Sequence, residues 1–528
     1  MKHATACPQC RSTKRKCAQD PADLQAACLA CQSRKIECSR PWNKQKSHRS
    51  MSWNNHKARL APSISATEQQ DKLPVASPEA IESYVQLYFR FIHDRPHSLF
   101  HEASLWTALR NGTLPESLKA AICALGCRFS SEPDQRELAT TFAARSKTLL
   151  GQQLENICVA NIQTCILLAN SYAAERNHGL EAVYFGIANR MAYVLGLHRQ
   201  NYTDPPILRE TKLRVWLSLF MADKWCSPGL GLPREIVRSD PSLDLPLDEV
   251  RFQSLRSADD DYLPERSIGI WAYKITLAEI LTSIQDVNLS LLHNHVDRRK
   301  IDQEVDDIAT RLLTWHDRLP PYMTMNDENL EAHRAKGQGG TFVALHFGYH
   351  HYSTLLYFQF LEPDRERDEK ILAYANRCSY HGLAFSRLLH TARKFGDCHV
   401  VYLTVAHMTI VSSSVLLHML LFGDDAEVEV ARLQLSLNFE ALEHLNDYWP
   451  GVKQLKERLF VFQDACLRSS AARAYAVDRW IVRFLLEYSL PFEKREDDAA
   501  TTPSSVHSTP ISLERRAFLS KALEDVGW

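Results

Sequence analysis

The chain has 528 residues, of which 45% are hydrophobic and 24% charged, and it contains only 18 glycines. This balance is typical of a soluble globular protein, excludes a disordered or collagen-like chain, and favours helices because a fold with many tight turns needs more glycine. The net charge of -1 hides an asymmetry: residues 1–60 hold 13 Lys and Arg against 3 Asp and Glu, a net charge of +10, and the rest of the chain carries -11. A polyanion would therefore bind the first 60 residues.

The start of the chain, MKHATACPQCRSTKRK, has no apolar run that could serve as a signal peptide, so secretion is not expected. Six of the 14 cysteines fall within residues 7–38, and the others are scattered through apolar segments. Reduced cysteine packs as a small hydrophobe in such segments, so a reducing compartment fits both groups.

The six clustered cysteines form an internal repeat in which the unit C-x2-C-x6-C occurs twice: Cys7, Cys10, Cys17, Cys28, Cys31 and Cys38. Thiolates two residues apart can converge on one soft metal ion, usually tetrahedral Zn²⁺. Two separate sites need eight thiolates, and the block offers six and no histidine. Either one site is complete and two cysteines are spare, or two zinc ions share two bridging thiolates, which the repeat favours. A disulfide framework and a purely structural zinc knot are the alternatives.

A basic run lies between the second and third cysteines, where four of the six residues are basic: Arg11, Lys14, Arg15 and Lys16. On a short helix, Arg11, Lys14 and Arg15 share one face. A charge run is usually a solvated surface, but metal ligands on both sides would fix this one in space, so we expect it to contact DNA.

The block resembles the fungal zinc binuclear cluster family of transcription factors over about the first 40 residues, because its cysteine spacing is that family's pattern. The resemblance implies two zinc ions on six thiolates, with Cys7 and Cys28 in the bridging positions. It implies that Lys14 reads a CGG-type triplet in the major groove, and Thr13 stands where the family usually has Lys or Arg. The expected DNA contacts are Arg11, Lys14, Arg15, Lys16, Arg34, Lys35, Lys44 and Lys46.

So small a module (residues 1–40) cannot supply a hydrophobic core, so bound metal should provide most of its folding energy. The next segment, residues 41–78, is basic and then rich in Ser and Pro, which predicts a flexible linker with phosphate-contacting arms and a nuclear import signal. Its apolar residues keep no heptad register and three prolines interrupt it, so no coiled coil is expected. The protein would then bind as a monomer or form a homodimer through its large domain.

Residues 79–490 show helical periodicity with breakers between segments, which predicts a large all-α domain after the zinc module. No phosphate-binding loop, nucleophile elbow or zinc-protease motif occurs, so we expect no enzyme here. The glycine cluster at 336–342 is predicted to be a loop. The helical spacings of His346, His350 and His351, of Cys123 and Cys127, and of Cys158 and Cys165 are interpreted as core packing, with metal binding or redox sensing as the alternatives.

The uncharged segment 398–423 is long enough to cross a bilayer. It carries three histidines, two threonines and three serines, and such polar groups are disfavoured in lipid. We therefore expect a buried core helix, with membrane contact as the alternative.

This region is similar to the fungal-specific transcription factor domain, clearly over residues 80–250 and diffusely afterwards. The matching positions are Gly196, Leu197, His198, Arg199, Trp216, Asp223, Gly231 and Pro233, while Leu217 and Lys224 stand where the family often has an aromatic and Arg. The resemblance implies an all-α domain that controls the output of a transcription factor by sensing a metabolite or an inhibitory partner.

The last segment, residues 491–528, is predicted to be a disordered tail that ends in an amphipathic helix. That helix could contact a coactivator or dock on the large domain. The whole pattern predicts a nuclear, zinc-dependent, sequence-specific transcription factor that binds double-stranded DNA and the transcription machinery. A repressor or recruiting scaffold and, last, an enzyme within the helical domain are the alternatives.

Overall fold

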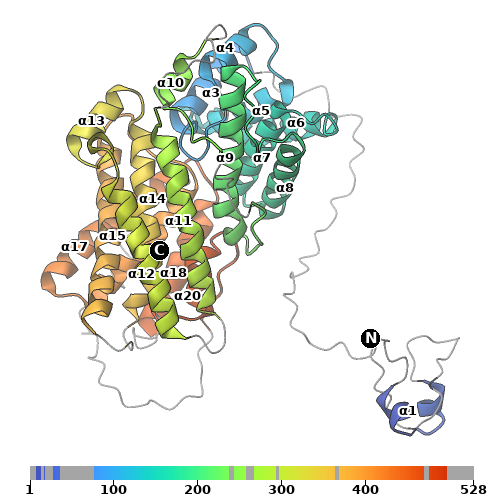
Figure 1. The fold of residues 1–528 in the computed structure, drawn as a ribbon, viewed down its shortest axis with the longest axis vertical. Coiled ribbons are helices and arrows are strands. Elements are labelled where there is room, and N and C mark those ends of the chain that lie inside the picture. The colour runs from blue at the N-terminus through green and yellow to red at the C-terminus, as the bar shows by residue number, and fades with distance from the viewer. Residues whose placement is uncertain are drawn as a thin grey trace. The chain divides into compact units, whose positions relative to one another are not determined.

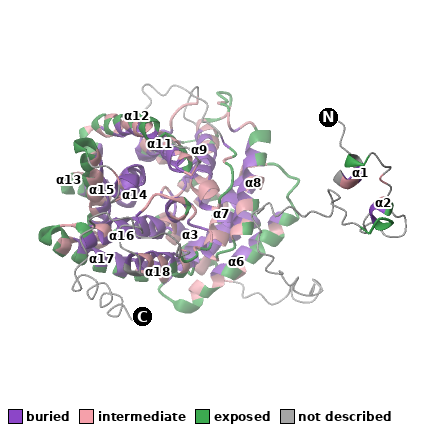
Figure 2. Ribbon diagram, turned by 90° about the horizontal axis from the view of Figure 1, so that it is seen from below, coloured by how far each residue is buried: buried purple, intermediate pink, exposed green. Residues whose placement is uncertain are grey.

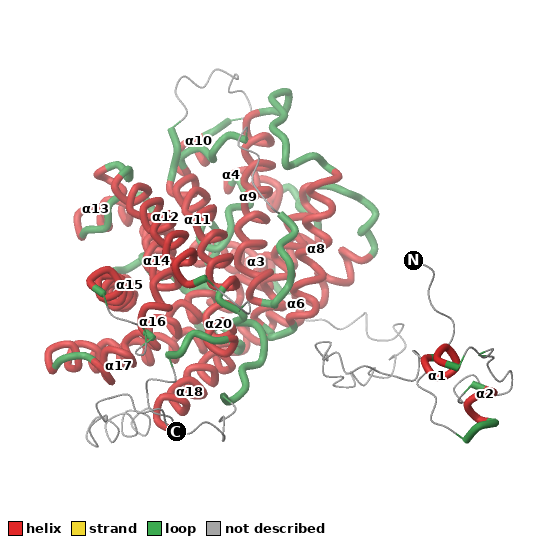
Figure 3. Tube along the Cα trace, turned by 60° about the horizontal axis from the view of Figure 1, so that its bottom comes forward, coloured by secondary structure: helices red, strands yellow, loops and turns green. Residues whose placement is uncertain are grey.

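The computed structural model describes residues 7–13, 17, 28–35, 76–236, 243–256, 267–292, 297–362, 365, 368–468 and 475–495. The chain divides into two compact units, Met1–Pro74 and Val75–Trp528, which are taken separately below. The described part contains helices and loops, with two isolated β-bridges and no strand (Figure 3). The prediction of a mostly all-α protein is confirmed.

The first unit contains two short helices, α1 (Pro8–Ser12) and α2 (Leu29–Gln32). Each begins at the residue after a cysteine, Cys7 or Cys28, and includes the cysteine three positions later. The buried apolar atoms of this unit belong to four cysteines, with Cys17 and Ala30 packed against them. No conventional core is present among its described residues.

The second unit is built from helices in two groups. The first group comprises α3 (Pro78–Phe91), α4 (Glu102–Arg110), α5 (Glu116–Gly126), η1 (Cys127–Phe129), α6 (Pro133–Gly151), α7 (Val159–Ala174), α8 (His178–Val194), α9 (Pro206–Gly229) and α10 (Glu249–Ser254). The second comprises α11 (Ile270–Ser290), α12 (Arg298–Asp317), η2 (Pro321–Met323), α13 (Asp327–Ala335), α14 (Gly339–Tyr357), η3 (Phe358–Leu361), α15 (Glu369–Lys394), α16 (Thr404–Phe422), α17 (Asp425–Asn446), α18 (Val452–Arg468) and α20 (Arg479–Leu486).

The two groups meet where α9 packs against α11, as the green and yellow-green helices of Figure 1 show. Within the first group α7 packs on α8 and α5 on α6, and within the second α14 and α16 both pack on α15. The most buried helices, α14 and α16, lie inside the second group, where Figure 2 shows them almost wholly purple. One hydrophobic core extends through both groups.

Polar caps fix where several of these helices begin. Ser77 accepts a hydrogen bond from the Ala80 N–H at the start of α3, and Pro78 occupies its first turn. Asp424 and Glu427 form a reciprocal capping box at the start of α17. These caps satisfy N–H groups that have no partner inside their own helix.

Helix α16 is long and apolar enough to span a membrane, and it is the one such helix found among the described residues. In its most apolar window 89% of the residues are buried inside the protein. Its polar groups have internal partners: the Ser412 hydroxyl donates to the Gly382 carbonyl at 2.8 Å, and Asn438 donates to Ser413 at 3.0 Å. The geometry is that of a core helix, as the sequence indicated.

The glycine cluster at 336–342 differs from the predicted loop. Only its first part is a turn, in which Gly337 has a φ of +72°, whereas Gly339 and Gly340 begin α14. A Cβ on Gly339 would lie 2.6 Å from the Cys398 sulfur, and one on Gly340 would lie 2.5 Å from Arg95 Nε. These glycines therefore serve close packing at the helix start, which the prediction missed because glycine also punctuates loops.

The histidines of α14 do not converge on one point. His346 pairs with the Met323 carbonyl, His350 with His381 of α15, and His351 stacks on Trp225 of α9. Burial lowers the pKa of each to about 3, which keeps all three neutral. They act as core side chains.

The cysteines of the large unit that were considered as redox sensors lie mostly in its interior. Burial raises the pKa of Cys123, Cys127 and Cys165 to about 12, and Cys158 is half-buried. A thiol that stays protonated reacts poorly with oxidants, which fits core packing.

Asp223 and Gly231, two of the positions that match the family, hold one loop of the large unit against helix α9. The Asp223 carboxylate accepts the N–H groups of Glu235 at 2.9 Å and Ile236 at 3.1 Å, and the Ser227 hydroxyl at 2.8 Å. Gly231 takes a φ of +66° in the turn between them. Asp223 is buried, and Lys224 beside it donates to the Ile236 carbonyl. This motif has a structural role in the described residues.

The first residues of the predicted disordered tail, 491–495, are packed in the structure. Residues 491–495 lie against α20, where Phe492 packs on Trp480 and Phe484, and Trp480 donates to the Glu493 carbonyl at 3.0 Å. Aromatic contacts hold this segment although its composition, PFEKR, is polar. Residues 496–528, with the predicted amphipathic helix, lie outside the described residues.

Candidate metal centre and basic surface

Four of the six clustered cysteines converge on one point. The sulfur atoms of Cys7, Cys10, Cys28 and Cys31 all lie within 4.8 Å of one another, and all four residues are buried. The Cys7 sulfur lies 3.9 Å from that of Cys28 and 3.8 Å from that of Cys31, and the sulfurs of Cys10 and Cys28 are 3.5 Å apart. Residues 18 to 24 positions apart in the chain thus present one thiol set.

This set fits a tetrahedral zinc ion. A Zn–S bond of about 2.3 Å places two ligand sulfurs of a tetrahedron about 3.8 Å apart, close to the separations given above. A disulfide would need sulfurs about 2.05 Å apart, and none of the three sulfur separations given above is shorter than 3.5 Å. The donor chemistry and spacing therefore support a metal site rather than the disulfide alternative.

The local backbone explains the convergence. Each C-x2-C pair spans the first turn of a short helix, so the second cysteine returns to the side of the first. The Cys10 N–H points to the Cys7 sulfur at 3.4 Å, and the Cys31 N–H donates to the Cys28 carbonyl at 2.8 Å. Such N–H groups stabilise negative charge on sulfur.

The thiols differ in acidity. Burial raises the pKa of Cys28, but hydrogen bonds from the Cys31 backbone and the neighbouring thiols outweigh it and lower that pKa to about 6. Burial, reinforced by hydrogen bonds to Cys28 and Cys7, raises the pKa of Cys10 to about 12. Without a cation the pocket cannot hold four thiolates, and a divalent ion would supply the charge that lets all four ionise.

The remaining two cysteines are placed differently. Cys17 is half-buried beside the four, with its sulfur 3.4 Å from the Cys7 N–H. Cys38 lies outside the described residues. The described geometry thus contains one complete four-thiol set and a fifth cysteine adjacent to it.

The basic residues are described only in part. Arg34 and Lys35 are exposed directly after α2, and Lys35 has a φ of +50°. Arg11 belongs to α1, although its side chain lies outside the description, as do Lys14, Arg15, Lys16, Lys44 and Lys46. The two exposed cations stand beside the thiol set, on the segment that follows Cys31.

One contact was not anticipated from the sequence. Arg34 Nη1 donates to the Thr13 hydroxyl at 3.4 Å, and Thr13 in turn donates to the Gln9 carbonyl at 2.8 Å. Thr13 and Arg34 hold equivalent places in the repeat, each three residues after the second cysteine of its unit. The threonine that stands in place of a basic residue therefore joins the two halves, and the equivalence within the repeat was the signal that could have found it.

Comparison with protein families places a known domain in the second unit. Residues 85–317 match the fungal specific transcription factor domain. This range covers α4 to α12 in full and the second half of α3.

Curated relatives extend the likeness over more of the chain. An uncharacterized transcriptional regulatory protein of Schizosaccharomyces pombe is 23% identical over 60% of this chain and 36% of its own length. Two Zn(2)-C6 fungal-type transcription factors of Fusarium oxysporum f. sp. lycopersici, FTF1c and FTF2, are each 22% identical, over 72% and 80% of this chain. The matches span 45% and 43% of those two proteins, so this chain corresponds to less than half of each. These relatives are regulators of transcription rather than enzymes.

Proposed function

We propose that this chain, which matches the fungal specific transcription factor domain over residues 85–317, binds DNA in a sequence-specific way through its N-terminal cysteine module. The single observation that carries this proposal is the convergence of four buried thiols beside exposed basic residues. The net charge of +10 on residues 1–60, against -11 on the rest, restricts the DNA-facing surface to the same end.

The module would hold two zinc ions on Cys7, Cys10, Cys17, Cys28, Cys31 and Cys38. Support comes from the repeat, which gives both halves the same spacing, and from Cys17, which lies beside the four-thiol set. Bound zinc supplies the positive charge that ionised thiols require, so the ions would build the module and leave the basic side chains to contact DNA.

Base reading is assigned to Lys14, which would donate to guanine in a CGG-type triplet of the major groove. Arg11, Arg15, Lys16, Arg34, Lys35, Lys44 and Lys46 would mainly contact phosphates. Contacts with base edges provide specificity, whereas contacts with phosphates provide affinity that falls as salt rises.

The helical unit would control the transcriptional output of the bound protein in the nucleus. Its partners would be the transcription machinery or coactivators, and a second copy of the chain could join through this unit, since the sequence after the cysteine module predicts no zipper. Whether the output is activation or repression, and for which metabolic pathway or gene cluster, depends on these partners.

The proposal is tested by equilibrium binding of the full chain to duplexes with one CGG triplet, two triplets at varied spacing, or a scrambled sequence. We expect preference for CGG, and Lys14→Ala should lose about 1–3 kcal/mol of that preference. Lys57→Ala, a change in the same basic end outside the proposed contact set, should retain it. Equal affinity for all duplexes, or a preference unaffected by Lys14→Ala, would overturn the base-reading proposal.

A further inference from the structure

The end of α1 carries two exposed hydroxyl groups, those of Ser12 and Thr13. Both donate to the Gln9 carbonyl, Ser12 at 3.1 Å and Thr13 at 2.8 Å. Ser12 is the last residue of the helix, and Thr13 lies one position beyond it. An enzyme that modifies side-chain hydroxyl groups can therefore reach both of them from the solvent.

The sequence around these hydroxyl groups is strongly basic. It reads RSTKRK over residues 11–16, with bases on both sides of the pair and no acid. Basophilic protein kinases bind such flanking cations through carboxylates of their own, which gives electrostatic complementarity with this segment. Kinases that require acidic flanks or a following proline do not fit it.

Arg34, in the second half of the cysteine module, distinguishes Thr13 from Ser12. The Arg34 Nη1 donates to the Thr13 hydroxyl at 3.4 Å, and among the described residues no carboxylate pairs with this guanidinium. The arginine is exposed. A neutral hydroxyl at this distance is a weak acceptor, so most of the donors of Arg34 are unused within the described part of the module.

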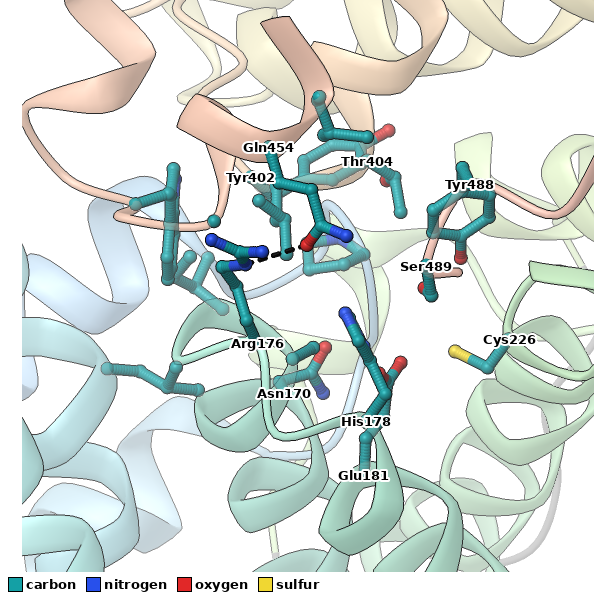
Figure 4. Close-up of a pocket in the computed structure, with 18 of the residues that line it drawn as sticks. Asn170, Arg176, His178, Glu181, Cys226, Tyr402, Thr404, Gln454, Tyr488 and Ser489 are labelled. Atoms are coloured by element: carbon teal, nitrogen blue, oxygen red, sulfur yellow. Dashed lines mark hydrogen bonds and ion pairs between the residues drawn. The ribbon is translucent and has the colours of Figure 1, made fainter. Parts of the chain in front are cut away.

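A contact between an exposed arginine and a neutral acceptor also occurs in the helical unit. There Arg176 donates to the Gln454 amide oxygen at 2.6 Å, as the dashed line in Figure 4 shows. An amide is not a substrate of protein kinases, whereas the hydroxyl of Thr13 is a chemical acceptor of phosphate. Only the contact at Thr13 combines an exposed hydroxyl, basic flanks and a facing arginine.

A phosphate group on Thr13 would change both the charge and the contacts of the module. It adds about 1.5 to 2 negative charges and three strong acceptor oxygens at neutral pH. Arg34 would then donate to phosphate oxygens, and such charge-assisted bonds are stronger than its bond to the hydroxyl. The same charge would stand next to Lys14 in the sequence and would repel the phosphates of DNA.

We propose that Thr13 is a phosphorylation site for a basophilic protein kinase, and that Arg34 holds the phosphate while the added charge blocks DNA binding. The Thr13 hydroxyl oxygen attacks the γ-phosphorus of ATP, a new P–O bond forms, and the bond to the bridging oxygen of the β-phosphate breaks. ADP leaves with the electron pair of that bond, and a base of the kinase takes the hydroxyl proton. The site does not depend on the proposed function, and only the loss of DNA binding rests on it.

The first experiment measures the modification alone. The full chain is incubated with ATP, Mg²⁺ and the catalytic domain of protein kinase A or protein kinase C, and mass spectrometry of its peptides locates the phosphate. We expect phosphate on Thr13, which Thr13→Val abolishes and which Ser12→Ala, the matched control, retains. No phosphate on Thr13 with either kinase would overturn the site, whatever the affinity of the chain for DNA.

The second experiment tests whether Arg34 holds the phosphate. Titration of the phosphorylated chain followed by ³¹P nuclear magnetic resonance gives the second pKa of the phosphate, which is about 6 without a partner. We expect a lower pKa in the unaltered chain, because a nearby guanidinium favours the dianion. Arg34→Met should return the pKa toward 6, and Arg176→Met, the control in the other unit, should not. An equal pKa in all three chains would overturn the role of Arg34.

The third experiment measures the consequence for DNA. Phosphorylation should weaken binding to a CGG duplex at least about tenfold, since it offsets one to two of the positive charges that face DNA phosphates. Unchanged affinity after complete modification would overturn the block of DNA binding. If the unmodified chain shows no preference for CGG, the proposed function fails, and the first two experiments still decide the site.

Discussion

At the residue scale, Cys28 connects the two halves of the cysteine module. Its sulfur lies near the sulfurs of Cys7 and Cys10 in the first half, while its carbonyl accepts the Cys31 N–H in the second. Because the buried apolar atoms among the described residues of this unit are its thiols, no other core among those residues can replace a lost ligand. The folding stability of the module should therefore depend on bound metal.

We predict that Cys28→Ala abolishes zinc binding and binding to CGG duplexes, since zinc provides about 10–16 kcal/mol in small zinc modules. Zinc content by mass spectrometry and DNA affinity would be measured on the full chain. Cys158→Ala is the matched control because Cys158 lies half-buried in the other unit and should change neither quantity. Retention of stoichiometric zinc in Cys28→Ala would contradict the ligand assignment.

The residues that could be identified from the sequence are marked by a local spacing pattern. The residues that were missed are placed by contacts with distant parts of the chain. The cysteine spacing predicted that thiols two residues apart converge on metal, and four of the six, Cys7, Cys10, Cys28 and Cys31, lie together in the structure. Lys274, a buried lysine of α11 that donates to the Arg95 carbonyl, gave no such signal, since a single lysine in WAYKITLAEIL is consistent with a helix surface position. Its burial depends on α14 and on the loop around Arg95, which are far away in the sequence.

At the element scale, glycine sets how closely two helices of the first group approach. Gly126 ends α5 where that helix crosses α3, and a Cβ there would lie 2.0 Å from the Tyr84 carbonyl oxygen. Gly151 ends α6 and has no atom within 4 Å of the same position. Both are last residues of helices, so they form a matched pair that differs in packing.

We predict that Gly126→Ala destabilises the helical unit by about 3 kcal/mol, because the Tyr84 backbone must move to admit the methyl group. Gly151→Ala should leave stability unchanged or raise it by up to about 1 kcal/mol, since alanine favours helix. Chemical denaturation followed by circular dichroism measures both. Equal effects of the two substitutions would show that the close crossing of α3 and α5 does not limit stability.

The spacing of apolar residues predicted where the helices of the large unit form, but not which segments pack against one another. The segments with apolar residues at three- and four-residue spacing became helices, and the proline-rich breakers fall between them. The glycines at 339–340 and residues 491–495 were assigned wrongly because their structure comes from Cys398, Arg95 and Trp480, which pack there from other elements. Such tertiary contacts override local composition.

At the scale of the whole molecule, the charge of the chain follows its division into two units. The basic end carries the cysteine module, and the acidic remainder carries the helical unit. The acidic unit should repel DNA phosphates, so long-lived binding would depend on the cysteine module and weaken as salt rises. A chain whose net charge is near zero can therefore still have a strongly cationic end, as the proposed contact with DNA requires.

The account depends most on a metal-built module at this end, and the most direct test is the number of zinc ions in the purified full chain, counted by native mass spectrometry. If six cysteines hold two zinc ions by sharing two thiolates, the count is two ions per chain. A strong chelator should then remove both ions and abolish binding to CGG duplexes. One ion per chain would favour a single four-thiol site with Cys17 and Cys38 spare. No bound zinc, or DNA recognition that persists without metal, would contradict the account.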